Sequence, residues 1–359
     1  MTSVVLRRLA LAGACVSLLA LAACETPAPE APPPPPPPPP LPTVALSSSV
    51  TDAASAYLTY MRQAAAQAPG FQDAQAIQNT LQVSASYEPG QMSRGVIAYA
   101  AVLALQDREF VQAVRELGRD PTVRAEMVRQ LAADPAYAAQ LPGAASAAGL
   151  VVAQLNADGQ AVLRAGQAVK QDAYDIQRNS DPRHRWARRP VEGLQERLDR
   201  TKALSARSMA PDAQESARLY QAAHSGLGLS VVPGRTGAPY TPVVARGLAL
   251  AALAALGEAG ESNQALVDAL LVDTDSPFCM NMAKLNLFQC LAVSRPNFED
   301  VFCLAQHGLM DTGQCVMNAA GAVLPVEFGP PAVSLASNEG AAAQAEQSAQ
   351  TAAGTAAGG

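Results

Sequence analysis

The stretch SPFCMNMAKLNLFQCLAV, residues 276–293, and its continuation SRPNFEDVFCLAQHGLMDTGQC, residues 294–315, decide how the carboxyl-terminal part of this chain folds. Residues 276–293 predict a helix, because proline is tolerated in the first helical turn and the next proline, Pro296, stops the pattern. A second helix is predicted to begin near Asn297 and to be interrupted at Gly308 and Gly313. The stretch therefore predicts two successive helices joined by a short turn.

Four cysteines in this stretch indicate how the two helices are arranged. Cys279 and Cys290 share a face of the first helix, but they stand roughly 16 Å apart along its axis. That separation exceeds the Cα distance of about 7 Å that a disulfide can bridge. An antiparallel second helix brings Cys303 to Cys290 and Cys315 to Cys279. The predicted disulfides are therefore Cys290–Cys303 and Cys279–Cys315, nested within a helical hairpin.

A metal site is the alternative use of these cysteines, with His307 beside them. Zinc sites usually place paired ligands two to four residues apart, and these spacings are far longer, so no metal and no cofactor are predicted. The segment from Phe278 to Cys315 resembles a block of uncharacterised envelope proteins of alphaproteobacteria. The resemblance implies no activity and transfers no site residue.

The rest of the chain predicts an all-α fold. Alanine is abundant, aromatic residues make up 4% of the chain, and runs of β-branched residues are few, a composition that favours closely packed helices. Asp120-Pro121 and Asp134-Pro135 each read as a helix cap followed by proline at the first helical position. Further helices are predicted over 49–67, 72–83, 95–106, 108–117, 121–133, 149–155, 160–178, 190–207, 211–224 and 243–256.

The composition changes at several places and suggests a domain organisation. Residues 45–225 are interpreted as a helical domain, and 243–328 as a helical subdomain that carries the four cysteines. The Gly/Pro-rich stretch 226–242 separates them, and its residues 229–232 are read as loop in preference to a short strand. Residues 329–359, rich in alanine, glutamine and glycine, are predicted to be disordered because they offer little apolar surface to bury.

The amino terminus reads as a secretory leader. Arg7 and Arg8 precede an apolar run too short to span a bilayer comfortably, and Leu21-Ala22-Ala23-Cys24 follows. This tetrapeptide resembles the lipobox of bacterial lipoproteins. The resemblance implies cleavage of residues 1–23, acylation of Cys24, and a mature chain held in the cell envelope. Glu25, in place of the aspartate that favours inner-membrane retention in that class, implies the outer membrane, with the protein facing the periplasm.

A proline-rich linker, residues 24–44, follows the cysteine, with prolines unbroken from Pro32 to Pro40. Proline fixes φ and lacks a donor, so the linker is predicted to adopt polyproline II. At about 3.1 Å per residue, Pro27 to Pro42 would reach about 50 Å. The linker is interpreted as a spacer that holds the folded region away from the membrane.

Charge and motifs exclude several classes of function. The formal charge is −6, and losing Arg7 and Arg8 with the leader makes it more negative, which argues against nucleic-acid binding. The three histidines are isolated in sequence, and no hydrolase or protease motif is found. His224 and His307 are interpreted as caps of helix ends. The acids Glu109/Glu116 and Glu192/Glu196 are interpreted as solvated helix faces, and no catalytic residue is predicted.

One segment concentrates positive charge, around the single tryptophan, Trp186. Guanidinium groups pair with phosphates and carboxylates in two-point geometry, so an anion-binding surface is one interpretation. The other is a helix whose charges pair internally, as Glu196 and Arg200 could. The candidate anion-binding residues are Arg183, Arg185, Arg188 and Arg189.

The sequence thus predicts a lipid-anchored, non-enzymatic envelope protein that contacts another envelope protein or peptidoglycan. Two alternatives stay open. One is a carrier whose helices over 95–106 and 243–256 enclose an apolar cavity for lipid. The other is a cell-wall-remodelling enzyme whose catalytic carboxylate the sequence does not reveal.

Overall fold

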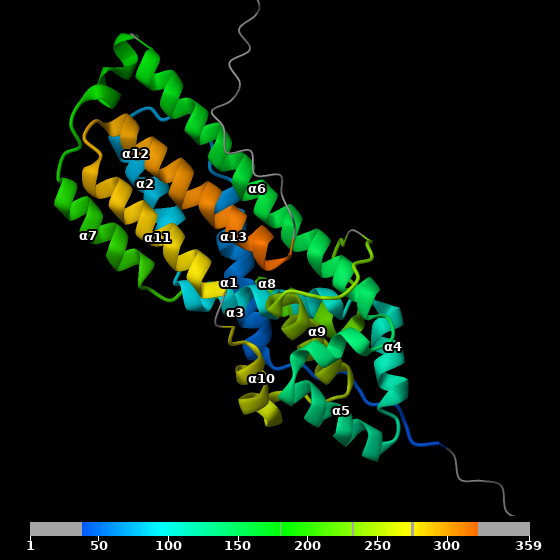
Figure 1. Cartoon of the computed structure of the whole chain (residues 1–359). Helices are drawn as coiled ribbons and strands as arrows, with labels where there is room; N and C mark the ends of the chain where they lie inside the picture. The colour runs from blue at the N-terminus through cyan, green and yellow to red at the C-terminus, as the bar shows by residue number, and fades with distance from the viewer. Residues whose placement is uncertain (1–37, 180, 232, 274–275, 322–359) are drawn as a thin grey trace, which may run out of the picture. The chain divides into compact units, whose positions relative to one another are not determined.

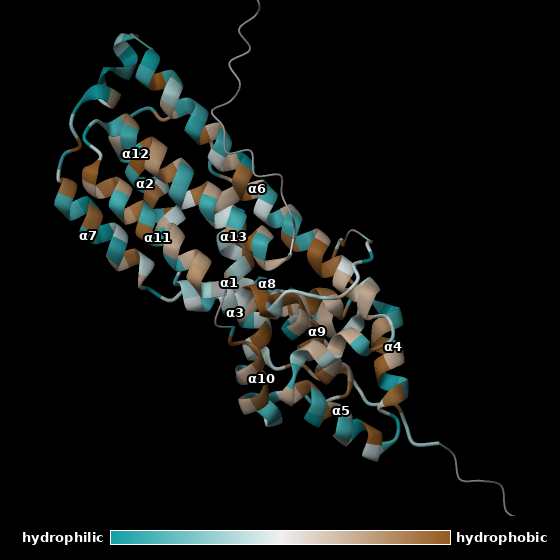
Figure 2. Cartoon of the chain, in the orientation of Figure 1, coloured by the Kyte–Doolittle hydropathy of each residue, from teal (hydrophilic) through white to brown (hydrophobic). Residues whose placement is uncertain are grey.

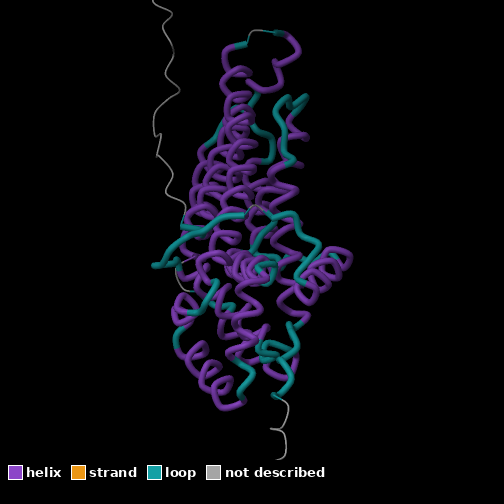
Figure 3. Tube along the Cα trace, turned by 90° about the vertical axis from the view of Figure 1, so that its right-hand side faces the viewer, coloured by secondary structure: helices purple, strands orange, loops and turns teal. Residues whose placement is uncertain are grey.

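A computed structural model describes residues 38–179, 181–231, 233–273 and 276–321. The predicted leader, Cys24, most of the proline linker and the carboxyl-terminal tail lie outside the described residues. Figure 3 shows that every regular element of the described part is helical, which confirms the predicted all-α fold.

The described residues form α-helices joined by short 3₁₀-helices and one π-helix (Figure 1). They are α1 (Ser48–Ala65), α2 (Ala74–Ala85), α3 (Pro89–Ala104), α4 (Arg108–Leu117), α5 (Pro121–Ala133), the 3₁₀-helix η1 (Pro135–Gln140), α6 (Ala144–Arg178), the 3₁₀-helix η2 (Pro182–Arg188), α7 (Leu194–Ser205), α8 (Ala213–Ser225), α9 (Pro242–Ala255), η3 (Glu261–Asn263), α10 (Gln264–Leu270), α11 (Ser276–Val293), α12 (Asn297–Cys303), the π-helix η4 (Leu304–Met310) and α13 (Asp311–Ala319).

Local signals set several helix ends. The Asp120 side chain accepts a hydrogen bond from the backbone N–H of Thr122 at 2.7 Å and starts α5 where it was predicted. Asp134 caps in the same way, but only the short 3₁₀-helix η1 follows it. The helix predicted over 95–106 begins earlier, at Pro89, because the Glu88 carboxylate accepts hydrogen bonds from two backbone N–H groups and caps α3.

The largest error concerns α6, which was predicted as two pieces and is one helix of 35 residues. Its three glycines lie at close contacts with other parts of the chain: Gly149 against Gly234, Gly166 against η4, and Gly159 against α13. A Cβ added at Gly159 would lie 2.6 Å from the Gly313 carbonyl oxygen, and one added at Gly313 would lie 2.6 Å from that of Gly159. Two backbones this close leave no room for side chains, so the glycines let α6 and α13 touch.

The helices α3 and α9 are almost completely buried and pack against each other. Nearly every side chain of α9 is buried, as its apolar sequence predicts (Figure 2). A Cβ added at Gly247 would lie 2.6 Å from the Cβ of Ala100, so these two helices lie in direct contact. The carrier alternative expects an apolar cavity enclosed by these two helices, and neither of the two pockets described below is lined by residues of α3 or α9. No helix among the described residues is long and apolar enough to cross a membrane.

Residues on both sides of the Gly226–Pro242 stretch contribute to one core. Residues of α1, α3 and α6 pack with those of α9 and α11 in a continuous set of buried apolar side chains. The described residues from Pro40 to Gly321 belong to one compact unit. The stretch itself is loop where it is described, and it crosses α6, with Thr236 N–H donating to the Ala145 carbonyl oxygen at 2.9 Å.

The carboxyl-terminal hairpin has the predicted pairing. Cys279–Cys315 and Cys290–Cys303 are disulfides with Cα–Cα distances of 5.7 and 5.6 Å. Its second arm was predicted to be interrupted at glycine. Instead α12, η4 and α13 follow one another without a break, with one π-turn region in the middle.

Candidate functional site

The basic segment around Trp186 is divided between the 3₁₀-helix η2 and the helix α7. Residues 190–207 were expected to be helical, but α7 begins only at Leu194, and the arginines lie on η2 and the extended residues after it. The side chains of Arg183, Arg185, Arg188 and Arg189 are all exposed. The sequence therefore placed these four residues correctly at the surface.

Two of the four arginines already have protein partners. Arg183 pairs with Asp181, whose Oδ2 lies 2.6 Å from Nη2, and these hydrogen bonds lower the pKa of Asp181 to about 2. Arg188 Nη2 donates to the carbonyl oxygen of Gln177 at 3.3 Å and to that of Asn179, at the carboxyl end of α6. A cation there interacts favourably with the helix dipole.

Arg185 and Arg189 keep their guanidinium groups free of hydrogen bonds to the part of the chain that the structure describes. Arg188 uses only its Nη2 in the contacts with the end of α6. Arg185, Arg189 and the other N–H groups of Arg188 are therefore the ones left for an external anion.

Backbone hydrogen bonds fasten the arginine segment to the turn between α11 and α12. Val191 N–H donates to the Arg295 carbonyl oxygen at 2.7 Å, and Asn297 N–H donates to that of Arg189 at 3.1 Å. The Asn297 side chain also donates to the Trp186 carbonyl oxygen at 3.0 Å. The arginines are thus held at the end of the hairpin that carries the Cys290–Cys303 disulfide.

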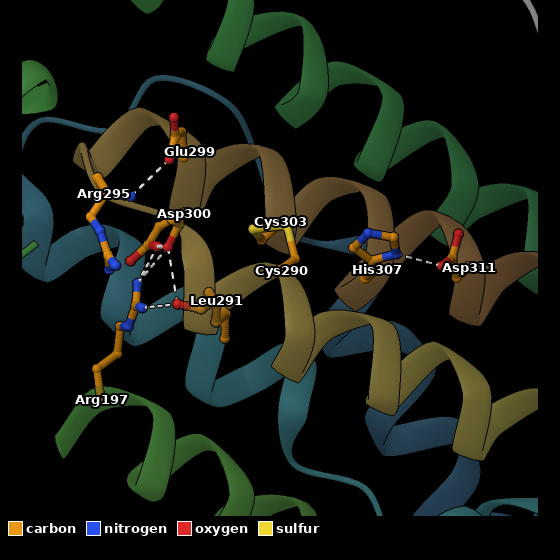
Figure 4. The surroundings of a disulfide bond; sticks show 10 residues. Arg197, Cys290, Leu291, Arg295, Glu299, Asp300, Cys303, His307 and Asp311 are labelled. Carbon is orange, nitrogen blue, oxygen red and sulfur yellow. Dashed lines mark hydrogen bonds and ion pairs between the residues drawn. A yellow bond between two sulfur atoms is a disulfide. The ribbon is translucent and has the colours of Figure 1, made fainter. Parts of the chain in front are cut away.

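A buried ion pair lies beneath this end of the hairpin (Figure 4). Arg197 of α7 and Asp300 of α12 are 3% and 0% exposed, and Asp300 also accepts from Ser294 Oγ at 2.6 Å. Burial raises the pKa of the Asp300 carboxyl above its usual value, although Arg197 opposes the shift. Arg197 belongs to the basic segment around Trp186, but it is buried, and its partner comes from a helix about a hundred residues later.

A buried lysine was not predicted from the sequence. Lys284 of α11 is 4% exposed, and its Nζ donates to Ser205 Oγ at 2.9 Å and lies 3.8 Å from the centre of the Tyr87 ring. Burial lowers its pKa well below the usual value. Lys284 is the single charged residue of α11, and that was the available signal. Its partners come from α7 and from the residues after α2, so it joins these elements to the hairpin.

The histidines take two different roles. His224 Nδ1 lies 2.8 Å from the Tyr220 carbonyl oxygen near the end of α8, which confirms its predicted position at a helix terminus. His307 was also interpreted as a helix cap, which is wrong, because the helical path continues through it. It pairs with Asp311, with Nδ1 and Oδ2 2.8 Å apart.

The predicted acidic pairs lie on the surface. Glu109 and Glu116 of α4 are exposed, as are Glu192 and Glu196. Among the described residues no group of histidine, cysteine and acidic side chains is arranged to hold a metal ion. The four cysteines of the hairpin are occupied by their disulfides.

Two surface pockets are formed by described residues. One, of about 650 Å³, lies where Pro233, Gly234 and Arg235 approach the start of α4. The other, of about 450 Å³, lies between α6, α11 and α12, and its lining includes Tyr174, Phe302 and the Cys290–Cys303 disulfide. Neither pocket is lined by Lys284, Asp300 or the His307–Asp311 pair.

In comparisons with known proteins, no family model, no curated protein and no solved structure matches this chain.

Proposed function

We propose that this chain is a lipid-anchored envelope protein, attached through Cys24 and facing the periplasm, with a non-enzymatic role in binding another envelope protein. The anchor rests on the Leu21-to-Cys24 motif and on the proline linker that follows it. The binding role rests on the surface of the hairpin.

The observation that carries the proposal is an uncovered apolar face on α11. Phe278, Met282, Leu285 and Val293 are 68%, 38%, 45% and 71% exposed. Their spacing places all four on one side of the helix, where the exposed Gln289 separates Leu285 from Val293. Apolar residues recur along α11 in Figure 2, and the described part of the chain leaves this side of the helix open. A row of large apolar side chains on the surface of a folded domain is typical of a protein-binding surface.

The arginine segment extends this surface at the Val293 end of α11. Arg185 and Arg189 lie on the segment that is hydrogen bonded to the α11–α12 turn. A partner that offers an apolar strip followed by acidic groups would complement both features. Exposed charges at the rim of such an interface mainly affect the association rate and its dependence on salt.

The contacts of the buried titratable groups favour a structural role for these groups. Lys284 is hydrogen bonded to Ser205, Asp300 to Ser294 and Arg197, and Asp158 to Tyr57 and Gln154. Each links helices of the core, and none lines either described pocket. Their partners satisfy them, as expected of groups that stabilise helix packing.

Site-specific photocrosslinking in living cells tests the proposal. A photoreactive residue is placed in the full-length protein at Leu285, and the matched control carries it at Gln171, an exposed polar position on α6. We expect one dominant adduct with an envelope protein at Leu285 and none at Gln171. The adduct should weaken in the variant Arg185→Gln/Arg189→Gln and at high salt. The same adducts at both positions, or no protein adduct at Leu285, would contradict the proposal.

A further inference from the structure

The pocket between α6, α11 and α12 has the dimensions of a small-molecule site. Its volume of about 450 Å³ falls within the range of roughly 300–1,000 Å³ that such sites occupy. It lies at the end of the hairpin that holds the arginine segment. Its lining includes Tyr174 and Gln177 of α6, Val293 of α11, Phe298, Glu299 and Phe302 of α12, and the Cys290–Cys303 disulfide.

The walls suit an apolar body. Tyr174, Phe298 and Phe302 are half-buried, and the Tyr174 and Phe302 rings lie 6.1 Å apart in a tilted arrangement. The Cys290–Cys303 disulfide fixes α11 to α12 and so keeps two of the three walls together. Aromatic rings held in place in this way offer a large contact area to a ligand at little entropic cost.

Two cations touch residues of the lining. The Lys170 Nζ lies 5.2 Å from the centre of the Phe302 ring, and it donates to Gln306 Oε1 at 2.7 Å. Arg188 contacts the Gln177 carbonyl oxygen at 3.3 Å. A positive charge therefore stands beside an α12 residue of the pocket and another beside an α6 residue.

One carboxylate also lines the pocket. Glu299 Oε2 accepts a hydrogen bond from the Arg295 backbone N–H at 2.7 Å, at the start of α12 (Figure 4). A carboxylate in the first turn of a helix is stabilised by the local backbone dipoles and keeps its negative charge. Asp175, on the neighbouring turn of α6, is paired with Arg178 at 3.3 Å. An acid group in the pocket therefore has to lie away from Glu299, toward the two positive charges beside the lining, Lys170 next to Phe302 and Arg188 next to Gln177.

We infer that this pocket binds a small anionic amphiphile, that is, an aliphatic chain or aromatic ring system carrying one carboxylate, sulfonate or phosphate group. The apolar body lies against Tyr174, Phe298 and Phe302. The acid group is directed toward Lys170 or Arg188. This site is separate from the proposed protein-binding face of α11, with which it shares only Val293.

The test uses the chain from Pro40 to Gly359, which contains the whole compact unit, with its disulfides formed. The probe is 8-anilinonaphthalene-1-sulfonate, whose fluorescence rises on leaving water, and its uncharged analogue is N-phenyl-1-naphthylamine. We expect saturable binding of one sulfonate probe per chain. Dodecanoate should displace it, and dodecyltrimethylammonium, which has the same chain and the opposite charge, should not.

Variants assign the binding to the pocket. Lys170→Gln/Arg188→Gln should weaken binding of the sulfonate probe by about tenfold and leave the uncharged analogue unaffected, because only the anion loses its charged partners. The matched control, Arg129→Gln/Lys202→Gln, removes the same charge from exposed positions elsewhere and should change neither affinity. Tyr174→Ala should weaken both probes.

Three results would overturn the inference. They are the absence of saturable binding, equal displacement by the cationic and anionic competitors, and loss of binding in Met282→Gln/Leu285→Gln, which would place the probe on the α11 face. That last variant also separates the two proposals. With the photoreactive residue moved to Phe278, it should abolish the protein adduct and leave probe binding intact. Dodecanoate and lysophosphatidylglycerol, compared as competitors, distinguish a free acid from a membrane lipid as the source of the anion.

Discussion

Removing the cation from the buried ion pair should destabilise the protein far more than removing a cation from an exposed pair. Arg197→Met leaves the Asp300 carboxylate, 0% exposed, without the guanidinium that compensates its burial. Breaking a buried pair in this way costs about 3–5 kcal/mol of the free energy of unfolding. The remaining hydrogen bonds, from Ser294 Oγ at 2.6 Å and Gln78 Nε2 at 3.4 Å, do not replace a positive charge.

The matched control is Arg62→Met. Arg62 pairs with Glu215 at 3.0 Å, but its side chain is 56% exposed. Water screens the exposed guanidinium of Arg62, and Glu215 keeps Arg218 as a second cation, so the loss should stay below about 1 kcal/mol. The two variants remove the same group, but only Arg197→Met leaves a buried carboxylate without any cation.

Urea-induced unfolding, followed by circular dichroism, measures both losses. In a chain of this size each kcal/mol also lowers the thermal midpoint by about 2 °C, so Arg197→Met should melt about 6–10 °C below the parent protein. The double variant Arg197→Met/Asp300→Leu should recover much of the loss, because no charge is then left in the core. If Arg197→Met unfolds within about 1 kcal/mol of the Arg62 control, or if the double variant is the least stable, the reasoning is refuted.

Three further predictions concern other parts of the chain. The outer disulfide, Cys279–Cys315, joins residues 36 positions apart, and the inner one, Cys290–Cys303, joins residues 13 apart. Because the longer loop loses more entropy on closure, Cys279→Ala/Cys315→Ala should lower the free energy of unfolding in urea by about 4 kcal/mol, and removal of the inner disulfide by about 3 kcal/mol. The opposite order would contradict this loop-closure argument. Burial raises the pKa of Asp158 from 3.8 to about 6, so the folded state holds this proton more tightly and stability should fall by about 2 kcal/mol as pH rises from 4 to 7. In Asp158→Asn that fall should be absent, and an unchanged pH profile of unfolding would show that Asp158 is not its source. Finally, Cys24→Ser should abolish metabolic labelling with palmitate and release the protein from the membrane fraction, whereas labelling that persists would reject the proposed anchor.

The amino-acid sequence by itself determined the features that depend on neighbouring residues. The α4, α5 and α11 bounds match the predicted ones, because a capping side chain, a proline or a glycine acts within one helical turn. The disulfide pairing could also be predicted from the sequence, because it depends on local helix geometry. Helical rise alone forbids Cys279 from reaching Cys290, and a short turn leaves the antiparallel arrangement as the one that joins all four cysteines.

Only the tertiary structure decided the features that join distant parts of the chain. Gly159 looks like a helix breaker until Gly313 is seen to lie against it, and Arg197 looks like a surface charge until Asp300 is placed beside it. The pocket likewise combines residues from α6 with others more than a hundred positions later. Contacts of this kind depend on how helices pack, and the local sequence around each residue carries no record of its partner.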